Sequence, residues 1–88
     1  MSLNQSDRMS LNKSAGALIR DLRKKKKISG EVLAGFVGVT QQQISRYERG
    51  ETELTLGKLQ EIAGFWGLSF WQFTDLLYSY HIKYINKK

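Results

Sequence analysis

The chain contains no cysteine and no proline, and it has a single histidine, His81, among its 88 residues. Without cysteine it can form neither a disulfide framework nor a thiolate metal site. His81 has no second ligand close to it in the sequence, so we expect neither a metal nor any other cofactor. No apolar run approaches the ~18 residues of a membrane span, and the N-terminus has no signal-peptide core. These absences favour a soluble cytoplasmic protein without a membrane partner.

Acidic residues are scarce, since 8 Asp and Glu stand against 14 Lys and Arg, for a net charge of +6. This balance favours a polyanionic partner, either nucleic acid or an acidic membrane surface. A membrane-surface protein would carry its cations and aromatic residues on one amphipathic helix, whereas here the two groups lie at opposite ends of the chain. No nucleophile–base pair or carboxylate cluster occurs at a useful spacing, so an enzyme is not expected.

The length is that of one small domain. Residues 1–13 are polar and unpatterned, and they repeat Met-Ser-Leu-Asn at positions 1–4 and 9–12. A cloning remnant, an alternative start at Met9 and a flexible arm each account for this segment. We expect residues 14–77 to form the domain and residues 78–88 to form a helical extension or a tail.

The first helix is expected from about Ser14 to Lys27, because apolar residues recur there at helical spacing: Ala15, Leu18, Ile19 and Leu22. It ends in four cations that repel one another unless an anion is close: Lys24, Lys25, Lys26 and Lys27. Such a run is often only a solvated charged end. Beside the polar helix described next, however, we expect these lysines to face phosphates.

Two short helices are expected next, joined by a turn. Ser29 caps the first, which runs from 30 to 37 with an apolar side of Val32, Leu33, Phe36 and Val37, and Gly38 ends it. Thr40 caps the second, with Gln43 placed to complete a capping box, and Gly50 ends it. Two short helices with a glycine-containing turn of this length are typical of a helix-turn-helix.

The second of these helices has a distinctive polar side. Ile44 and Tyr47 share one face and suit inward packing. Hydrogen-bonding side chains occupy the other face: Gln41, Gln42, Ser45 and Arg46. Gln bonds adenine and Arg bonds guanine in the major groove, which admits an α-helix. An ordinary solvated face explains these residues equally well, and the helix-turn-helix context favours base contacts.

Two further helices complete the pattern. Thr55 caps a fourth helix that reaches about Trp66, with an inward set of Leu56, Leu59, Ile62, Ala63 and Trp66, and Gly67 ends it. Ser69 and Gln72 form a capping box that opens a fifth helix through at least Leu77. No segment alternates with period two for long enough to be a strand. The predicted fold is all-α, with five helices.

The residues of this central region resemble the lambda repressor and Cro-like (XRE-type) helix-turn-helix family of bacterial and phage regulators. The resemblance covers roughly Gly16 to Phe73 and rests on Ile19-Arg20-Asp21-Leu22-Arg23, Ala34, Val37-Gly38-Val39-Thr40, Ile44-Ser45-Arg46-Tyr47-Glu48-Arg49-Gly50, Leu59, Ile62-Ala63 and Leu68-Ser69. A weaker likeness, in the Gln-rich start of the third helix, is to regulators encoded with fimbrial operons.

The resemblance implies a five-helix DNA-binding domain whose third helix enters the major groove. By position it implies base contacts from Gln41, Gln42, Ser45 and Arg46, phosphate contacts from Thr40 and Gln43, and a structural ion pair between Arg23 and Glu48. Two features depart from the family pattern: Gly30 stands where a phosphate-clamping Gln is common, and Glu51-Thr52-Glu53-Leu54 replaces a basic loop with a proline. We therefore expect Arg49, the four lysines and the arm residues Arg8 and Lys13 to supply phosphate contacts.

The C-terminal region is rich in aromatic residues. The apolar side of the helix that starts at Phe70 spans roughly 220°, whereas a core-facing stripe needs ~100° or somewhat more. Phe70, Phe73 and Leu77 suit the core. Four residues remain for an interaction surface: Trp71, Leu76, Tyr78 and Tyr80. We expect a homodimeric regulator that binds double-stranded DNA on a pseudo-palindromic operator; the alternative is an antitoxin-like module that binds a partner protein through this aromatic region.

Overall fold

The computed structural model describes the backbone of residues 5–86 and the side chains of residues 11–83. Within this range the chain forms five helices and no strand: α1 (Gln5–Lys25), α2 (Gly30–Val37), α3 (Gln41–Glu48), α4 (Leu56–Phe65) and α5 (Phe70–Asn86). The all-α fold with five helices expected from the sequence is therefore confirmed.

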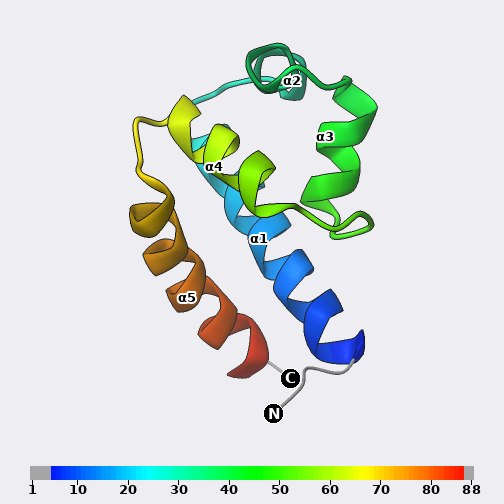
Figure 1. Ribbon diagram of the computed structural model, residues 1–88, viewed down its shortest axis with the longest axis vertical. Helices are drawn as coiled ribbons and strands as arrows, with labels where there is room; N and C mark the ends of the chain where they lie inside the picture. The colour runs from blue at the N-terminus through cyan, green and yellow to red at the C-terminus, as the bar shows by residue number, and fades with distance from the viewer. Residues whose placement is uncertain (1–4, 87–88) are drawn as a thin grey trace.

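The long helices α1 and α5 lie side by side and run in opposite directions, and α4 crosses in front of α1 (Figure 1). The helix α3 packs against α1 and α2, whereas α5 packs against α1 and α4. As a result α3 forms the right-hand edge of the molecule in Figure 1 and α5 forms the left-hand edge. The arrangement leaves the outer side of α3 uncovered by the described part of the chain.

The core lies where the helices meet and contains at least one residue from each of them. Its members recur at helical spacing: Ala15, Leu18 and Ile19 of α1; Leu33, Ala34 and Val37 of α2; Ile44 and Tyr47 of α3; Leu59, Ile62 and Ala63 of α4; Phe73 and Leu77 of α5. Each fully buried side chain of the size of Ile or Phe contributes roughly 1.5–3 kcal/mol of stabilisation. Packing of these faces, more than local propensity, holds helices as short as α2 and α3 in place.

Hydroxyl groups begin four of the helices, as their positions in the sequence predict. The side chains of Ser29, Thr40 and Thr55 accept hydrogen bonds from the backbone N–H groups of Val32, Gln43 and Lys58, at 3.1, 3.1 and 3.0 Å. At the start of α5, Ser69 and Gln72 form a reciprocal capping box, with N–H to side-chain distances of 2.8 and 3.1 Å. These caps satisfy N–H groups that have no partner inside the helix.

A left-handed turn ends α3. Gly50 has φ 72°, the N–H of Glu51 donates to the carbonyl of Arg46 at 2.9 Å, and the N–H of Gly50 donates to that of Tyr47 at 3.1 Å. The same turn ends α1 at Lys27, which has φ 56° although it is not a glycine. A left-handed residue thus ends both α1 and α3 and turns the chain sharply at each place.

The ends of the long helices differ from the expectation. The first helix was expected to begin at about Ser14, yet α1 begins at Gln5, so residues 5–13 are helical; residues 1–4 lie outside the described residues. The helix α5 continues past Leu77 to Asn86 and runs beside α1. The buried hydroxyl of Ser14 is hydrogen-bonded to Nδ1 of His81 at 2.9 Å, which joins these two extensions.

Several residues expected on inward faces are exposed. Leu56, at the first residue of α4, is 74% exposed because it lies one turn before the first buried residue of that helix, Leu59. Val32 and Phe36 of α2 are also exposed, since that helix buries only the side that carries Leu33 and Val37. The ring of Phe36 packs edge-on against Phe65, with centroids 5.0 Å apart.

The closest approach between helices occurs at Gly16. A Cβ atom at this position would lie 2.6 Å from the carbonyl oxygen of Glu48 and closer still to that of Tyr47. Gly50 is similarly close to α1, since a Cβ there would lie 2.8 Å from Cα of Lys13. The backbone of α1 therefore rests directly on the last turn of α3, and this contact fixes the position of α3.

We predict that Gly16→Ala lowers the free energy of unfolding by on the order of 1–3 kcal/mol, because the rigid backbone of α3 has to move to admit the methyl group. The matched control is Gly35→Ala, in an exposed helical position with no atom near the added methyl group. It should leave stability unchanged or raise it by up to about 1 kcal/mol. Urea denaturation measures both; equal midpoints would show that the contact at Gly16 is absent.

Candidate nucleic-acid interface

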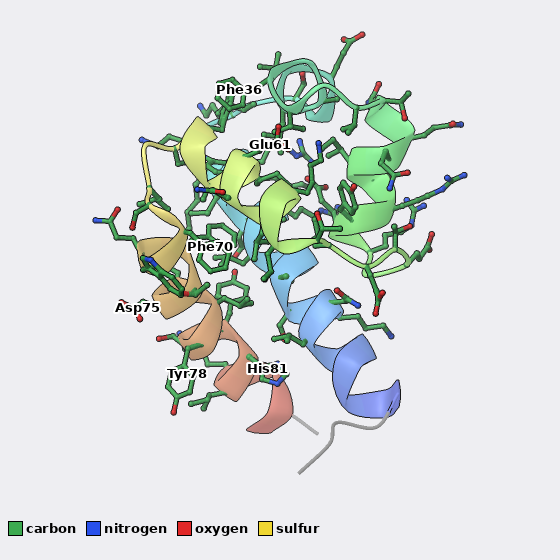
Figure 2. The ribbon with its side chains drawn as sticks, viewed as in Figure 1. Phe36, Glu61, Phe70, Asp75, Tyr78 and His81 are labelled. Atoms are coloured by element: carbon green, nitrogen blue, oxygen red, sulfur yellow. The ribbon has the colours of Figure 1, made fainter. Side chains whose placement is uncertain are left out.

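The helix α3 exposes the polar side that the sequence singled out. Ile44 and Tyr47 are buried against α1 and α2, whereas Gln41, Gln42 and Arg46 are exposed and Ser45 is half-buried. In Figure 2 the polar side chains along the outer edge of α3 extend away from the rest of the molecule. The buried side of α3 therefore anchors the helix, and its other side presents two amides, a hydroxyl and a guanidinium group.

The N-terminal end of α3 lies beside the N-terminal end of α2. Gly30 faces the side chain of Gln41, since a Cβ at Gly30 would lie 3.7 Å from Cγ of Gln41. Thr40 is exposed, and its hydroxyl oxygen accepts from the N–H of Gln43, which leaves the hydroxyl hydrogen available to a ligand. Exposed backbone N–H groups at a helix start suit an anion such as a phosphate. Gln43 itself is half-buried.

An ion pair joins the end of α1 to the end of α3. Arg23 donates through Nε and Nη2 to the two carboxylate oxygens of Glu48, at 2.7 and 3.0 Å. Its Nη1 donates to the carbonyl of Ile28 at 2.9 Å, which also closes the α1–α2 loop. The side chains are only 16% and 7% exposed, and the hydrogen bonds that Arg23 donates to the carboxylate raise the pKa of Arg23. The side chain of Arg23 therefore has a structural role inside the domain and is not a surface group.

Arg49, expected at a phosphate, is instead engaged within the chain. Its Nε and Nη2 donate to the two carboxylate oxygens of Glu51, at 2.9 and 3.1 Å, and its Nη1 donates to the hydroxyl of Ser45. The hydrogen bonds and charge of Arg49, together with the charge of Arg46, lower the pKa of Glu51. The sequence signal for this pair was the acidic residue that follows Gly50, and it was interpreted only as a source of repulsion from DNA.

The four lysines lie together where α1 ends. Lys24 and Lys25 belong to the last turn of α1, and Lys26 and Lys27 follow in the turn that leads to α2. All four are exposed. They form a compact group of positive charge on the same loop that the Arg23–Ile28 hydrogen bond holds in place.

The structure separates the four residues expected on the C-terminal interaction surface. Tyr80 was expected to be left over from the core, and this is wrong: it packs against the core and its hydroxyl donates to the carboxylate of Asp21. Leu76 is partly exposed on a different side of α5 from Trp71 and Tyr78. Ile82, which the sequence analysis missed, lies four residues after Tyr78 and shares its face, so the exposed face carries Trp71, Tyr78 and Ile82.

Two other kinds of feature do not occur among the described residues. Among the described residues, no three acidic, histidine or cysteine side chains are grouped closely enough to hold a metal ion. In the same part of the chain, no helix combines the length and the apolar character that crossing a membrane would need.

Comparison with known families gives one match. A helix-turn-helix family model matches residues 19–70, which is more than half of the chain and covers α2, α3 and α4. No curated protein and no solved structure matches the sequence. The matched region contains the exposed polar side of α3, the Arg23–Glu48 ion pair and the four lysines. The chain belongs to the lambda repressor and Cro-like (XRE-type) helix-turn-helix family of DNA-binding transcription regulators.

Proposed function

We propose that this protein is a homodimeric, sequence-specific regulator that reads a pseudo-palindromic operator in double-stranded DNA with α3. The observation that carries the proposal is the outward display of Gln41, Gln42 and Arg46 on a helix whose opposite side is buried and whose end is tied to α1. Amides and guanidinium groups are the side chains that form bidentate bonds with adenine and guanine. The cytoplasm, where such an operator would be found, is the proposed location.

Phosphate contacts flank the reading helix in this proposal. Thr40, the first N–H groups of α3 and the amide of Gln43 would meet one stretch of backbone, since a helix N-terminus attracts anions. The lysines at the end of α1 would meet another stretch and supply a large share of the nonspecific attraction. Arg49 contributes less to this attraction than its charge suggests, because Glu51 balances it.

A second copy of the chain would dock on a strip formed by α4 and α5. Leu56 and Trp71, which are 74% and 73% exposed, line one shallow hollow together with Gly57, Gln60 and Phe70. Tyr78 and Ile82 continue along α5 from Trp71. We call Leu56, Trp71, Tyr78 and Ile82 the α4–α5 strip. Its aromatic and aliphatic composition matches that of interface centres.

The α4–α5 strip lies apart from the outer side of α3, which suits a DNA-binding dimer. Figure 2 shows Phe70 and His81 on the side of α5 that faces the centre of the molecule, and Tyr78, a member of the strip, on the side that faces away from it. A two-fold axis that pairs the strips of two copies can therefore leave the outer side of α3 in each copy free to meet DNA.

Selection of bound sequences from a random DNA pool tests the whole proposal. We expect enrichment of an inverted repeat whose half-sites lie about 10–10.5 base pairs apart, or a multiple of this, because two reading helices occupy successive major grooves. A pool that yields no enriched sequence would overturn sequence-specific reading. An enriched site without two-fold symmetry would overturn the dimer.

We predict that Gln42→Ala and Arg46→Ala each weaken binding to the selected duplex by about 1–3 kcal/mol while leaving binding to a scrambled duplex nearly unchanged. The reason is that each change removes a base contact but no phosphate contact. Fluorescence anisotropy on both duplexes measures the effect, with Lys83→Ala on α5 as the control for a lost surface side chain. Equal losses on the two duplexes would refute base reading by α3.

We predict that replacing Lys24, Lys25 and Lys26 together by Gln weakens binding to every duplex alike. Each lost phosphate contact should lower the slope of log affinity against log salt by ~0.9, so that the triple change lowers it by about 2–3. Titrations at several salt concentrations measure the slope. Lys83→Gln, which removes a charge elsewhere, should leave it unchanged; a triple variant with the wild-type slope would show that the lysines do not touch DNA.

We predict that Trp71→Glu converts the dimer to a monomer, since the change removes a large apolar side chain from the strip and adds a second carboxylate one turn from that of Asp75. Leu76→Glu is the matched control, because Leu76 is an exposed apolar residue on another side of the same helix. Sedimentation equilibrium measures the mass of each variant. Dissociation by Leu76→Glu and not by Trp71→Glu would place the interface on the other side of α5.

The second candidate is an antitoxin-like module that binds a different protein. The same exposed strip favours it, because an apolar surface of this kind also suits a foreign partner. Native mass spectrometry of the purified chain and of complexes isolated from its host distinguishes the two. A stable homodimer supports self-association, whereas a monomer that is recovered only with a second protein supports the alternative.

A further inference from the structure

Ser45 differs from the other residues expected to face bases, because another side chain already bonds to it. A serine hydroxyl has one hydrogen to donate and two lone pairs to accept with. Nη1 of Arg49 donates to Oγ of Ser45, so one lone pair is occupied. A guanidinium group stays protonated and has no acceptor. The contact can therefore form only with Ser45 as the acceptor.

Arg49 is itself held in place by Glu51. The two parallel hydrogen bonds between the guanidinium and the carboxylate, at 2.9 and 3.1 Å, fix the plane of the arginine. Glu51 reaches this position because the left-handed turn at Gly50 folds the chain back on α3, where the N–H of Glu51 bonds the carbonyl of Arg46. The chain Glu51–Arg49–Ser45 thus runs from the end of α3 to its outer side.

The N–H group that Arg49 donates biases what Ser45 can bond next. The hydroxyl hydrogen of Ser45 must point away from the guanidinium, and an amino group that approaches the same oxygen meets the N–H donor already bound there. In the major groove guanine offers two acceptors, thymine offers one, adenine offers one beside an amino donor, and cytosine offers only an amino donor. A serine without such a neighbour bonds either kind of group.

We propose that Arg49, held by Glu51, makes Ser45 a dedicated hydrogen-bond donor, so that the protein accepts guanine, thymine or adenine and rejects cytosine at the base opposite Ser45. The inference rests on the proposed function, because it specifies one base contact within that site. Arg49 is then a positioning residue, in place of the phosphate contact expected from the sequence. Glu51 holds Arg49 in place, so the acidic loop after α3 has a structural role next to the DNA-binding surface.

The test repeats the selection from a random DNA pool with the wild-type protein and three variants. Ser45→Ala identifies the base position that Ser45 reads. Arg49→Lys keeps the positive charge but cannot hold Glu51 by two parallel bonds and also reach Ser45. Arg49→Met removes the charge as well. Both positions are at least partly exposed, and circular dichroism checks that each variant is folded.

We expect the wild-type protein to deplete cytosine, in favour of guanine, thymine or adenine, at the position that Ser45→Ala relaxes. Both Arg49 variants should lower the preference for these bases over cytosine at that position by about tenfold, and leave the positions read by Gln42 and Arg46 unchanged. Arg49→Lys should keep the wild-type salt dependence, since its charge is kept.

Three results would overturn the inference. One is enrichment of cytosine at the position that Ser45 reads. Another is an unchanged preference there in both Arg49 variants, together with weaker binding of Arg49→Met to every duplex, which is the behaviour of a phosphate contact. The third is that no position depends on Ser45 although Gln42→Ala and Arg46→Ala still alter theirs; the proposed function then stands without this inference. A pool with no enriched sequence for the wild-type protein removes both.

Discussion

The contact between the backbone of α1 at Gly16 and the last turn of α3 is the constraint on which the site depends. A helix that carries a side chain at this crossing has to stand further away, and the exposed side of α3 would then tilt. Arg23 holds the same turn from further along α1 through its paired bonds to Glu48. Because two separate points of α1 fix the end of α3, the outer side of α3 has one orientation in the folded domain.

Some cations of the domain are exposed, whereas others are paired within the chain. The lysines at the end of α1 give the domain an exposed group of positive charge. Arg49, the cation that follows α3 directly, is balanced by the carboxylate of Glu51 and is bonded to Ser45. The acidic loop that departs from the family pattern is therefore coupled to the polar side of the helix. Gly30, the other departure, lies against the side chain of Gln41 and leaves the start of α3 open.

One face of α5 is buried in the fold, and another face is exposed. Phe73 and Leu77 complete the core, and Tyr80 and His81 bond to side chains of α1, so this side of the helix is committed to the fold. On the opposite side Trp71 and Tyr78 are exposed, and Trp71 lies next to Leu56 of α4. An apolar side of roughly 220° is wider than one core needs, and the structure shows which part is left over.

The sequence by itself determined the local features: the caps at Ser29, Thr40 and Thr55, the glycine turns after α2, α3 and α4, and the polar side of α3. These depend on residues within one or two turns of each other, so spacing along the chain reveals them. Only the tertiary structure decided which of the remaining positions are covered by another helix. Leu56 is exposed and Tyr80 is half-buried, α1 begins at Gln5 and α5 continues to Asn86, and Gly16 touches α3. The physical reason is that each of these outcomes depends on a segment distant in the sequence, and helical periodicity says which residues share a face but not what packs against it.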